Sequence, residues 1–545
     1  MRVADRIIKA LENLGVQYVF GMSAGTVSAL YDALNDVDIQ PIIIKNEAGA
    51  AYSAAKYAGI SKNLGVCIVA GGVGINNMIN GIADAMRSKV PVLVLSGYVH
   101  RWQIGKGAIQ EIDTEKLLEP ITKYSKTILK EQEVLIELKK AIDISLTPPY
   151  GPVHLSIPID IQISEALIDE IDYNKKKDNI IEFKSDEIIK EAVEIIDKEE
   201  KGIIMVGKGC RGLSAQIREL ARHLNWPIIT TPEGKGIIST DFKLNLGNYG
   251  FSSTNASLSY VEDDEATCVI VLGSSLGESA TRNYNDVLVK GRKLIHIDWD
   301  KNEINKVFKA DIGICCDLKL AVPRLIAETK KKDVKFERGE MLNKPYERNH
   351  TGLSIRQFLE GIVDILPSDT YFVSDIGEYM NFLFKYLPIK DDMDFEISLN
   401  YGAMGSGIAG SMGTYLANPN KQIVVFVGDG SFFMNGTEIL TAKEYNMPII
   451  YFVINNSMLG YVYNGHNYLY KRTINRFVQD RISIADMAKS LGIKSIQINN
   501  VEEIEDIKNN ISNLNGPLVV ELITDGTEAP PVADRFVALS NKDAI

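Results

Sequence analysis

The feature that most constrains the fold is a series of short, apolar, β-branched runs separated by stretches with helical spacing. Near-continuous apolar strands joined by helices are typical of parallel sheets that are covered on both faces. The sequence therefore predicts an α/β protein. The predicted strands form three sets along the chain: PIIIKNE, GVCIVAG and VPVLVLSG, then GIIMVGKG, WPIITT, TCVIVLGS and KLIHIDWD, and finally YFVSDIG, QIVVFVGDGS, PIIYFVINN and PLVVELI.

The chain of 545 residues is too long for a single core and predicts about three domains. Two charged, irregular stretches, 172–187 and 327–350, separate the three strand sets and are predicted to be linkers. We place the domains at 1–170, 185–330 and 350–530. The first and third domains resemble two copies of one α/β plan.

Charge and cysteine content narrow the class of protein. The formal net charge of −12 argues against nucleic acid or an anionic membrane as the main partner, although a local site can still attract an anion. The five cysteines form no CxxC pair and are expected to be reduced core residues, which favours the cytoplasm. The N-terminal stretch reads as a helix followed by a strand, not as a signal peptide, and no run reaches the roughly 20 apolar residues of a membrane span.

One stretch, GDGSFFMNGTEILTAKEYNMPIIYFVINN at 428–456, predicts a site for a diphosphate and a metal ion. Ligands of open parallel sheets bind at the carboxyl ends of strands, where Gly428-Asp429-Gly430-Ser431 and Asn456 follow two predicted neighbouring strands. The glycines let backbone amides approach an anion, and the next helix is expected from about Asn435. Asp429 and Asn456 offer the hard oxygen ligands that magnesium prefers.

The same stretch resembles the thiamine-diphosphate binding motif, and GDGSFFMN…EYNMPI…NNSMLGYV resembles the acetolactate synthase branch of the thiamine-diphosphate-dependent enzymes. The resemblance covers nearly the whole chain. It implies an N-terminal pyrimidine-binding domain, a central domain and a C-terminal diphosphate-binding domain. It also implies that Asp429, Asn456 and the backbone carbonyl of Met458 hold Mg²⁺. The residues implied to contact the cofactor are Gly377, Tyr379, Gly402, Met404, Gly428, Asp429, Gly430, Ser431, Asn456, Met458, Leu459 and Gly460.

Glu47, in the stretch IIIKNEAGAAYSAAKYAG, matches the family's activating glutamate. The resemblance implies that its carboxyl group faces the pyrimidine ring of thiamine and promotes loss of the thiazolium proton. An apolar site favours sharing of a proton between a carboxylate and a ring nitrogen, and Ile44, Ala50 and Ala51 suit such a site. The small residues of this predicted helix also permit close approach of a partner helix.

Two further segments match the family with changes. In NYGAMGSGIAGSMG, Met404 stands where the family has the bulky residue that wedges between the two cofactor rings, but the family's following proline is missing. In YFVSDIGEYMN, Tyr379 stands where a histidine is usual and Glu378 stands where an amide is usual. Tyr379 is expected to donate a hydrogen bond near the diphosphate. A carboxylate at Glu378 is unfavourable there, so we do not assign it to the site.

The substrate pocket resembles the family less closely. Gln110 matches a catalytic-loop residue of the synthases, whereas Ile109 replaces a phenylalanine that borders the donor substituent. The synthase tryptophan that helps select the second keto acid is absent. The remaining residues expected to line the substrate pocket are Ser23, Ala24, Gly25, Tyr463 and His466.

Three reactions remain open on these residues. The first is carboligation of a decarboxylated 2-keto acid with a second carbonyl compound, as in acetolactate synthase. The second is non-oxidative decarboxylation, or lyase or hydrolase chemistry on the same cofactor, and the third is a non-catalytic regulatory role. The resemblance implies a homodimer or homotetramer in which Glu47 of one chain faces the diphosphate site of its partner. In the central domain, VGKGCRG (206–212) is compatible with FAD, but other family motifs for FAD are degenerate, so an empty nucleotide site is expected.

Overall fold

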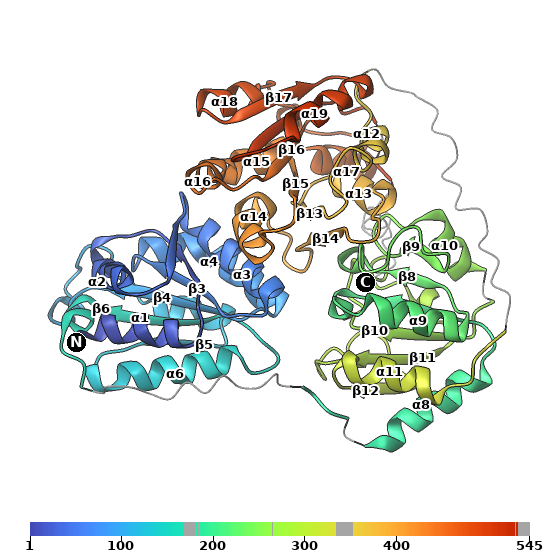
Figure 1. Ribbon diagram of the computed structural model, residues 1–545, viewed down its shortest axis with the longest axis horizontal. Coiled ribbons are helices and arrows are strands. Elements are labelled where there is room, and N and C mark those ends of the chain that lie inside the picture. The colour runs from blue at the N-terminus through green and yellow to red at the C-terminus, as the bar shows by residue number, and fades with distance from the viewer. Residues whose placement is uncertain (168–179, 184, 264, 334–351, 529, 532–545) are drawn as a thin grey trace.

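A computed structural model describes residues 1–167, 180–183, 185–263, 265–333, 352–528 and 530–531, and it consists of three α/β units (Figure 1). Each unit is built on a six-stranded parallel sheet, as the apolar runs predict. The predicted linkers lie largely outside the described residues, so the domain boundaries stay predictions. In the part of the chain that the structure describes, no helix is long and apolar enough to span a membrane.

The N-terminal unit has the strand order β2-β1-β3-β4-β6-β5. Helices α3, α4 and α5 cover the sheet face that turns toward the C-terminal unit, and α1, α2, α6 and α7 cover the other face. Its strands are β1 Tyr18–Gly21, β2 Gln40–Ile43, β3 Gly65–Val69, β4 Val92–Tyr98, β5 Tyr124–Thr127 and β6 Val153–Pro158. Its helices are α1 Val3–Asn13, α2 Ser28–Ala33, α3 Glu47–Ser61, α4 Val73–Ser88, α5 Thr114–Leu118, α6 Val134–Ser145 and α7 Ile159–Ile163.

The C-terminal unit repeats this plan, because its strand order β14-β13-β15-β16-β18-β17 is the same order shifted by twelve strands. The predicted duplication of the first and third domains is thus confirmed. Its strands are β13 Tyr371–Ser374, β14 Asp394–Ile397, β15 Ile423–Gly428, β16 Ile450–Asn455, β17 Lys494–Ile498 and β18 Leu518–Ile523. Its helices are α12 Ile355–Ile362, α13 Met380–Tyr386, α14 Ser406–Ala417, α15 Asp429–Asn435, α16 Ile439–Glu444, α17 Gly460–Tyr470, α18 Ile484–Ser490 and α19 Ile504–Ile511.

The central unit has a different order, β12-β11-β10-β7-β8-β9. Strands β10 and β7 form the central pair. From this pair, β10-β11-β12 runs to one edge of the sheet and β7-β8-β9 runs to the other. This is the order of doubly wound dinucleotide-binding domains. Its strands are β7 Gly202–Val206, β8 Ile228–Thr230, β9 Asn245–Asn248, β10 Cys268–Leu272, β11 Lys293–Asp298 and β12 Ile312–Cys315. Its helices are α8 Asp186–Lys198, α9 Ser214–Leu224, α10 Asn255–Glu262 and α11 Leu318–Glu328.

The N-terminal and C-terminal units share one hydrophobic core through α3 and α14. Small residues let these helices touch at the backbone: a Cβ atom on Gly413 would lie only 1.9 Å from the carbonyl oxygen of Ser53. The Ser53 hydroxyl donates a 2.8 Å hydrogen bond to the carbonyl oxygen of Ala409. The close approach predicted for the small-residue helix after Glu47 is therefore confirmed, within one chain.

The described cysteines behave as the sequence predicts, and one histidine is buried in the N-terminal unit. All five cysteines are free thiols, and four of them are buried. His154 is completely buried between the hydroxyls of Ser96 and Ser125, at 2.8 and 2.9 Å from its two ring nitrogens. Burial lowers the pKa of His154 to about 3, so this histidine is neutral and structural.

Candidate active site

The candidate site lies where two neighbouring strands of the C-terminal sheet end. Strands β15 and β16 are paired in parallel up to Gly428 and Ile454, and the loops that follow carry Asp429 and Asn456. Asp429 Oδ2 accepts a 2.7 Å hydrogen bond from the backbone amide of Ser457. The two loops thus converge, as their position after adjacent strands predicts.

The helix after the first loop begins earlier than expected. The sequence placed its start near Asn435, whereas α15 begins at Asp429 itself with Gly428 as its N-cap, so that prediction is wrong. The chain turns into the helix directly after the strand because Asp429 Oδ1 accepts the amide of Gly430 at 2.8 Å. Asp429 is therefore held in the first helical turn and is largely buried.

The oxygen atoms at this point suit a hard divalent cation. Asn456 Oδ1 accepts the amide of Met458 at 3.1 Å, and Ser457 between them has a left-handed φ of 56°, which folds the loop back toward Asp429. Each carboxylate or amide oxygen that accepts one hydrogen bond keeps lone pairs for a metal. Burial raises the pKa of Asp429, so a cation at this place would relieve an unfavourable charge. Oxygen donors of this kind fit Mg²⁺ rather than a thiophilic metal.

Met404 lies beside the residue that follows Asp429. A Cβ atom on Gly430 would be 3.3 Å from Cδ2 of Leu459 and 3.4 Å from Cε of Met404. The ends of the Met404 and Leu459 side chains therefore both approach Gly430. A bulky, partly exposed apolar side chain beside the oxygen ligands suits the predicted wedge under a bent cofactor. Gly402, two residues earlier, has a left-handed φ of 72°.

Asp375 holds the Met404 segment in place, and the sequence analysis did not single it out. This fully buried carboxylate follows strand β13 and accepts four backbone amides, from Ile376, Gly405, Gly407 and Ile408, at 2.7 to 3.1 Å. It ties the end of β13 to the start of α14. A buried acid directly after a strand is the sequence signal that would have found it.

Tyr379 does not make the contact predicted for it. Its hydroxyl donates a 3.0 Å hydrogen bond to the carbonyl oxygen of Phe426 in β15 and is buried, so it is not directed at a diphosphate. Its ring instead packs on the glycines of the site, since a Cβ on Gly377 would lie 2.5 Å from the ring and one on Gly428 would lie 3.3 Å from it. The Tyr379 hydroxyl is thus bonded to the strand backbone, and whether the residue also contacts the cofactor stays a prediction.

The Ser431 hydroxyl is also engaged by the protein. It donates a 2.9 Å hydrogen bond to the carbonyl oxygen of Ile376, which joins the loop after β15 to the loop after β13. Ser431 therefore fixes the relative position of two loops of the candidate diphosphate site. Whether it also contacts the cofactor stays a prediction.

Glu378, which the sequence analysis left out of the site, lies inside it. A Cβ on Gly460 would be 2.3 Å from Glu378 Oε2 and 3.2 Å from Nδ2 of Asn456. Glu378 Oε1 accepts a 2.5 Å hydrogen bond from Nδ2 of Asn464. Burial raises the pKa of Glu378, and the bond from Asn464 offsets only part of that effect. A carboxyl group thus lies beside Asn456, where an anionic cofactor end is expected.

Replacing Glu378 with glutamine is expected to tighten thiamine diphosphate binding by about tenfold, which equals about 1.4 kcal/mol. The amide keeps the size of the side chain and removes the charge that opposes the diphosphate. Isothermal titration of the cofactor in the presence of Mg²⁺ measures the change, with the exposed Glu502→Gln as the matched control. Unchanged or weaker affinity in Glu378→Gln would show that this carboxyl group does not face the diphosphate.

Glu47 is the first residue of α3, the helix of the N-terminal unit that packs against α14 of the C-terminal unit. Its carboxylate is half-buried, and Oε2 accepts a 2.9 Å hydrogen bond from Nδ2 of Asn77 on α4. The turn before it is anchored by Glu438, whose carboxylate accepts the backbone amides of Lys45 and Asn46. Glu438 comes from the C-terminal unit, only nine residues after Asp429, and the sequence analysis missed it.

The predicted substrate residues of the N-terminal unit lie on open loops. Ile109 is 91% exposed, and Gln110 next to it has a left-handed φ of 69° with its backbone packed on Gly72. The loop is folded by Glu111, whose carboxylate accepts amides from Gly105, Gly107 and Ala108. Nothing lies within 4 Å of a Cβ built on Gly25, and Ser23 is exposed, with Ala24 half-buried between them.

The C-terminal substrate residues lie on α17. His466 packs edge-on against the rings of Tyr470 and Phe477, with centroids 5.4 and 5.1 Å apart, so in this arrangement it is part of an aromatic cluster. Tyr463 is half-buried on the same helix. Among the described residues, no hydrogen bond or ion pair joins Glu47, Gln110 or the 23–25 loop to Asp429 or Asn456.

Comparison with known proteins gives matches to thiamine pyrophosphate enzymes along the chain. Residues 1–117 match the N-terminal TPP binding domain of these enzymes, residues 189–325 match the central domain, and residues 375–522 match the C-terminal TPP binding domain. These are three consecutive domains of one enzyme type, in the order of the three units seen here.

Acetolactate synthase large subunits are similar over nearly the full length. The probable large subunit of Methanocaldococcus jannaschii is 31% identical, with 99% of this chain and 95% of that protein covered. The large subunit of Lactococcus lactis subsp. lactis is 31% identical over 96% of this chain and 92% of that protein. The isozyme 2 large subunit of Escherichia coli K12 is 28% identical over 97% and 96%.

Proposed function

The chain belongs to the thiamine pyrophosphate enzyme family, and we propose that it catalyses acetolactate-synthase-like carboligation of a decarboxylated 2-keto acid with a second carbonyl compound. The full-length similarity to acetolactate synthase large subunits carries this proposal. Neither a non-oxidative decarboxylase nor a non-catalytic regulator is favoured by any relative reported above.

The residues of the C-terminal site fit the cofactor and its metal. Asp429, Asn456 and the carbonyl of Met458 would hold Mg²⁺, and this ion would bridge to the diphosphate, because the three groups supply only hard oxygen atoms. Gly428, Gly430 and Gly460 leave room beside these ligands, since a Cβ on any of them would meet a neighbouring side chain within 3.4 Å. Bound thiamine diphosphate supplies an electron sink that allows a 2-keto acid to lose carbon dioxide.

The protein's own groups then position the reaction. Met404 would support the cofactor and is itself fixed by Asp375 through the start of α14. The Glu47 carboxylate would hold a proton for the pyrimidine ring of the cofactor, and Asn77 orients this carboxylate by donating a hydrogen bond to Oε2. Within the described residues Oε1 accepts no hydrogen bond, so it is the oxygen available for this proton. Gln110 and Ile109 lie on the loop that we assign to the substrate side.

We assign the active site to the junction of two chains. The Glu47 face and the strongly exposed Ile109 belong to the N-terminal unit, whereas the metal ligands belong to the C-terminal unit, and within the described residues no hydrogen bond joins Glu47 to Asp429 or Asn456. In an isologous dimer, the N-terminal unit of each chain lies against the C-terminal unit of the other chain, so the dimer has two complete sites. A homodimer is the smallest active form under this proposal, and a homotetramer is a pair of such dimers. The free thiols fit a reducing cytoplasm.

The proposed function predicts a ligated product from pyruvate, a small 2-keto acid. The protein, supplied with thiamine diphosphate, Mg²⁺ and pyruvate, is expected to release carbon dioxide and form a five-carbon 2-hydroxy-3-keto acid. Mass spectrometry of the products measures this. Carbon dioxide with acetaldehyde as the sole organic product would contradict carboligation and would make the protein a decarboxylase.

A further inference from the structure

The central unit has the strand order of a dinucleotide-binding domain, so its carboxyl edge is where FAD would be expected. The loops at this edge, 207–212 after β7, 273–276 after β10 and 298–303 after β11, line a cavity of about 2000 Å³ that is also lined by the two other units. The cavity is large enough for a cofactor. Whether FAD fits depends on what these loops offer to a diphosphate and to ribose hydroxyls.

The glycine-rich loop after β7 does not offer its amides to a diphosphate. The amides of Gly207, Gly209 and Cys210 donate to the carbonyl oxygens of Leu272, Gly273 and Gly207, at 2.9 to 3.0 Å. The amide of Arg211 donates to the carbonyl of Lys208. The glycines serve close packing of two loops instead, because a Cβ on Gly209 would lie 2.9 Å from the Cα of Gly273.

The two cations of the same loop are also engaged. Lys208 forms an ion pair with Glu233 at 3.7 Å, and Glu233 accepts a 2.8 Å hydrogen bond from Asn400 of the C-terminal unit. The guanidinium group of Arg211 donates to the carbonyl oxygen of Phe395, at 2.7 Å. Arg211 therefore bonds the central unit to the C-terminal unit, and Lys208 is paired with a carboxylate of its own unit.

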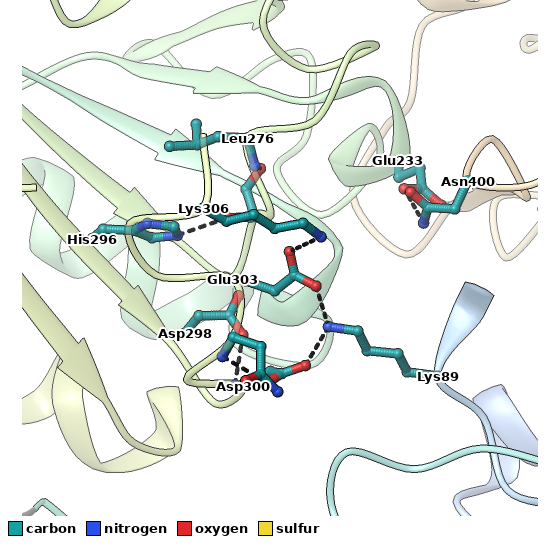
Figure 2. A network of polar contacts seen from close by, with 11 residues as sticks. Lys89, Glu233, Leu276, His296, Asp298, Asp300, Glu303, Lys306 and Asn400 are labelled. Atoms are coloured by element: carbon teal, nitrogen blue, oxygen red, sulfur yellow. Dashed lines mark hydrogen bonds and ion pairs between the residues drawn. The ribbon is translucent and has the colours of Figure 1, made fainter. Parts of the chain in front are cut away.

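The acidic residues after β11 are paired with a lysine from another unit (Figure 2). Lys89, which caps the end of α4 with a left-handed φ of 54°, reaches Oδ2 of Asp300 at 2.5 Å and Oε1 of Glu303 at 2.6 Å. Lys306 pairs with the other oxygen of Glu303 at 3.0 Å. Asp298 Oδ1 accepts the amide of Asp300 at 2.8 Å, which fixes the turn.

These ion pairs are buried, so breaking one of them lowers the stability of the protein. The side chains of Asp300 and Glu303 are 4% and 9% exposed. Burial opposes the charge on Lys89, but its hydrogen bonds to the two carboxylates raise its pKa overall. The Lys89 ammonium also lies 5.5 Å from the ring centre of Trp299, whose ring packs on Tyr150 of the N-terminal unit at 5.7 Å. Removing one partner from such a group leaves buried charges unpaired.

We propose that Lys89 takes the place of a dinucleotide at this edge, so that the protein carries no flavin and the chain itself clasps its N-terminal and central units together. We call Lys89, Trp299, Asp300 and Glu303 the clasp. In a doubly wound domain, ligands bind outside the carboxyl ends of the strands, and Asp300 and Glu303 lie at such an end. Here Lys89 engages Asp300 and Glu303, and the amides of Gly207, Gly209, Cys210 and Arg211 in the loop after β7 donate to carbonyl oxygens of the protein itself.

The flavin part is tested by two measurements that need no turnover. The protein purified from cells is expected to lack the absorbance bands of flavin. Titration of FAD with the protein, followed by the anisotropy of flavin fluorescence, is expected to show no saturable binding. Flavin in a one-to-one ratio to the purified chain, or saturable binding of added FAD, would overturn the inference whatever reaction the enzyme catalyses.

The clasp part is tested with Lys89→Met and a matched control, Lys62→Met. Lys62 also caps a helix of the N-terminal unit in the left-handed conformation and lines the same cavity, but its ammonium group bonds Gly59 of its own unit. Lys89→Met is expected to lower the thermal midpoint by several degrees and to enlarge the radius of gyration measured by X-ray scattering. Lys62→Met is expected to match the parent. Equal behaviour of the two variants would overturn the clasp.

A triple variant separates loss of the contact between the two units from the effect of an unpaired charge in the loop. Lys89→Met combined with Asp300→Asn and Glu303→Gln neutralises both carboxylates that pair with Lys89 but still lacks the clasp. It is expected to keep the enlarged radius of gyration of Lys89→Met. Return of the radius to the parent value would show that Lys89→Met merely exposes a charge imbalance in the loop, and this result would contradict a docking role.

Discussion

Replacing Asp429 with alanine is expected to release thiamine diphosphate from the protein. The carboxylate is the only charged group among the three proposed metal ligands, and it also accepts the amides of Gly430 and Ser457 that bring the two loops together. Its loss removes the metal bridge to the diphosphate. We expect the cofactor affinity to fall by about 100-fold or more, equal to about 2.8 kcal/mol, as measured by titration of thiamine diphosphate with Mg²⁺ present.

Two comparisons make the Asp429 result specific. Asp506→Ala removes an exposed carboxylate from α19 of the same unit and is expected to bind the cofactor like the parent. Asp429→Asn keeps the size of the side chain and an oxygen ligand, so it is expected to bind more weakly than the parent but more tightly than Asp429→Ala. If Asp429→Ala binds thiamine diphosphate with parental affinity, the assignment of the metal site is wrong.

Replacing Glu47 with glutamine is expected to leave cofactor affinity unchanged and to lower turnover by roughly 10² to 10⁴-fold. The amide is of equal size and still accepts the hydrogen bond from Asn77, so α3 and its packing on α14 should remain intact. It cannot hold the proton that the reaction requires at this position. Carbon dioxide release from pyruvate measures turnover, and titration measures binding.

The exposed Glu119→Gln is the control for Glu47→Gln, because it removes a carboxylate from the same unit with no bonding partner among the described residues. It is expected to turn over like the parent. Full activity in Glu47→Gln would remove the residue from the mechanism and would revive a binding or regulatory role for the chain. Loss of cofactor affinity together with activity would indicate that Glu47 has a structural role instead.

The fold was predictable where burial leaves a continuous apolar run. Strands such as GVCIV and IVVFV are buried on both faces and read plainly as parallel strands. Edge strands β5, β9, β14 and β17 were missed because YSKT, NLGN, DFEI and KSIQI mix polar and apolar residues. The edge strand β12 (IGIC) and the buried central strand β6 (VHLSIP) were missed as well. The start of α15 was misplaced because GDGS reads as a loop, although its aspartate belongs to the first helical turn.

The site was predictable where its residues directly follow a strand in the sequence. The loops of Asp429 and Asn456 follow adjacent strands, and the structure brings them together. Asp375 and Glu438 were missed because their partners lie far along the chain, as for the Glu438 bonds to backbone 45 and 46 across more than 390 residues. The new role of Tyr379 depends on the reach of a phenol to β15, which no local pattern shows.

The central claim is that Glu47 of one chain serves the metal site of another. Co-expressing Glu47→Gln and Asp429→Ala chains tests it most directly, because each variant is inactive alone and each keeps the half that the other lacks. In a mixed dimer with sites between chains, one of the two sites has both residues intact. Since about half of randomly paired dimers are mixed, about a quarter of the parental activity should return.

Differently tagged chains allow the mixed dimer to be purified and its activity compared with the parent. We predict about half of the parental turnover per mixed dimer, since one site of two is complete. If each chain instead builds its whole site from its own Glu47 and Asp429, no site in the mixed dimer is complete. A mixed dimer that stays inactive while retaining thiamine diphosphate in its Glu47→Gln chain would contradict the account.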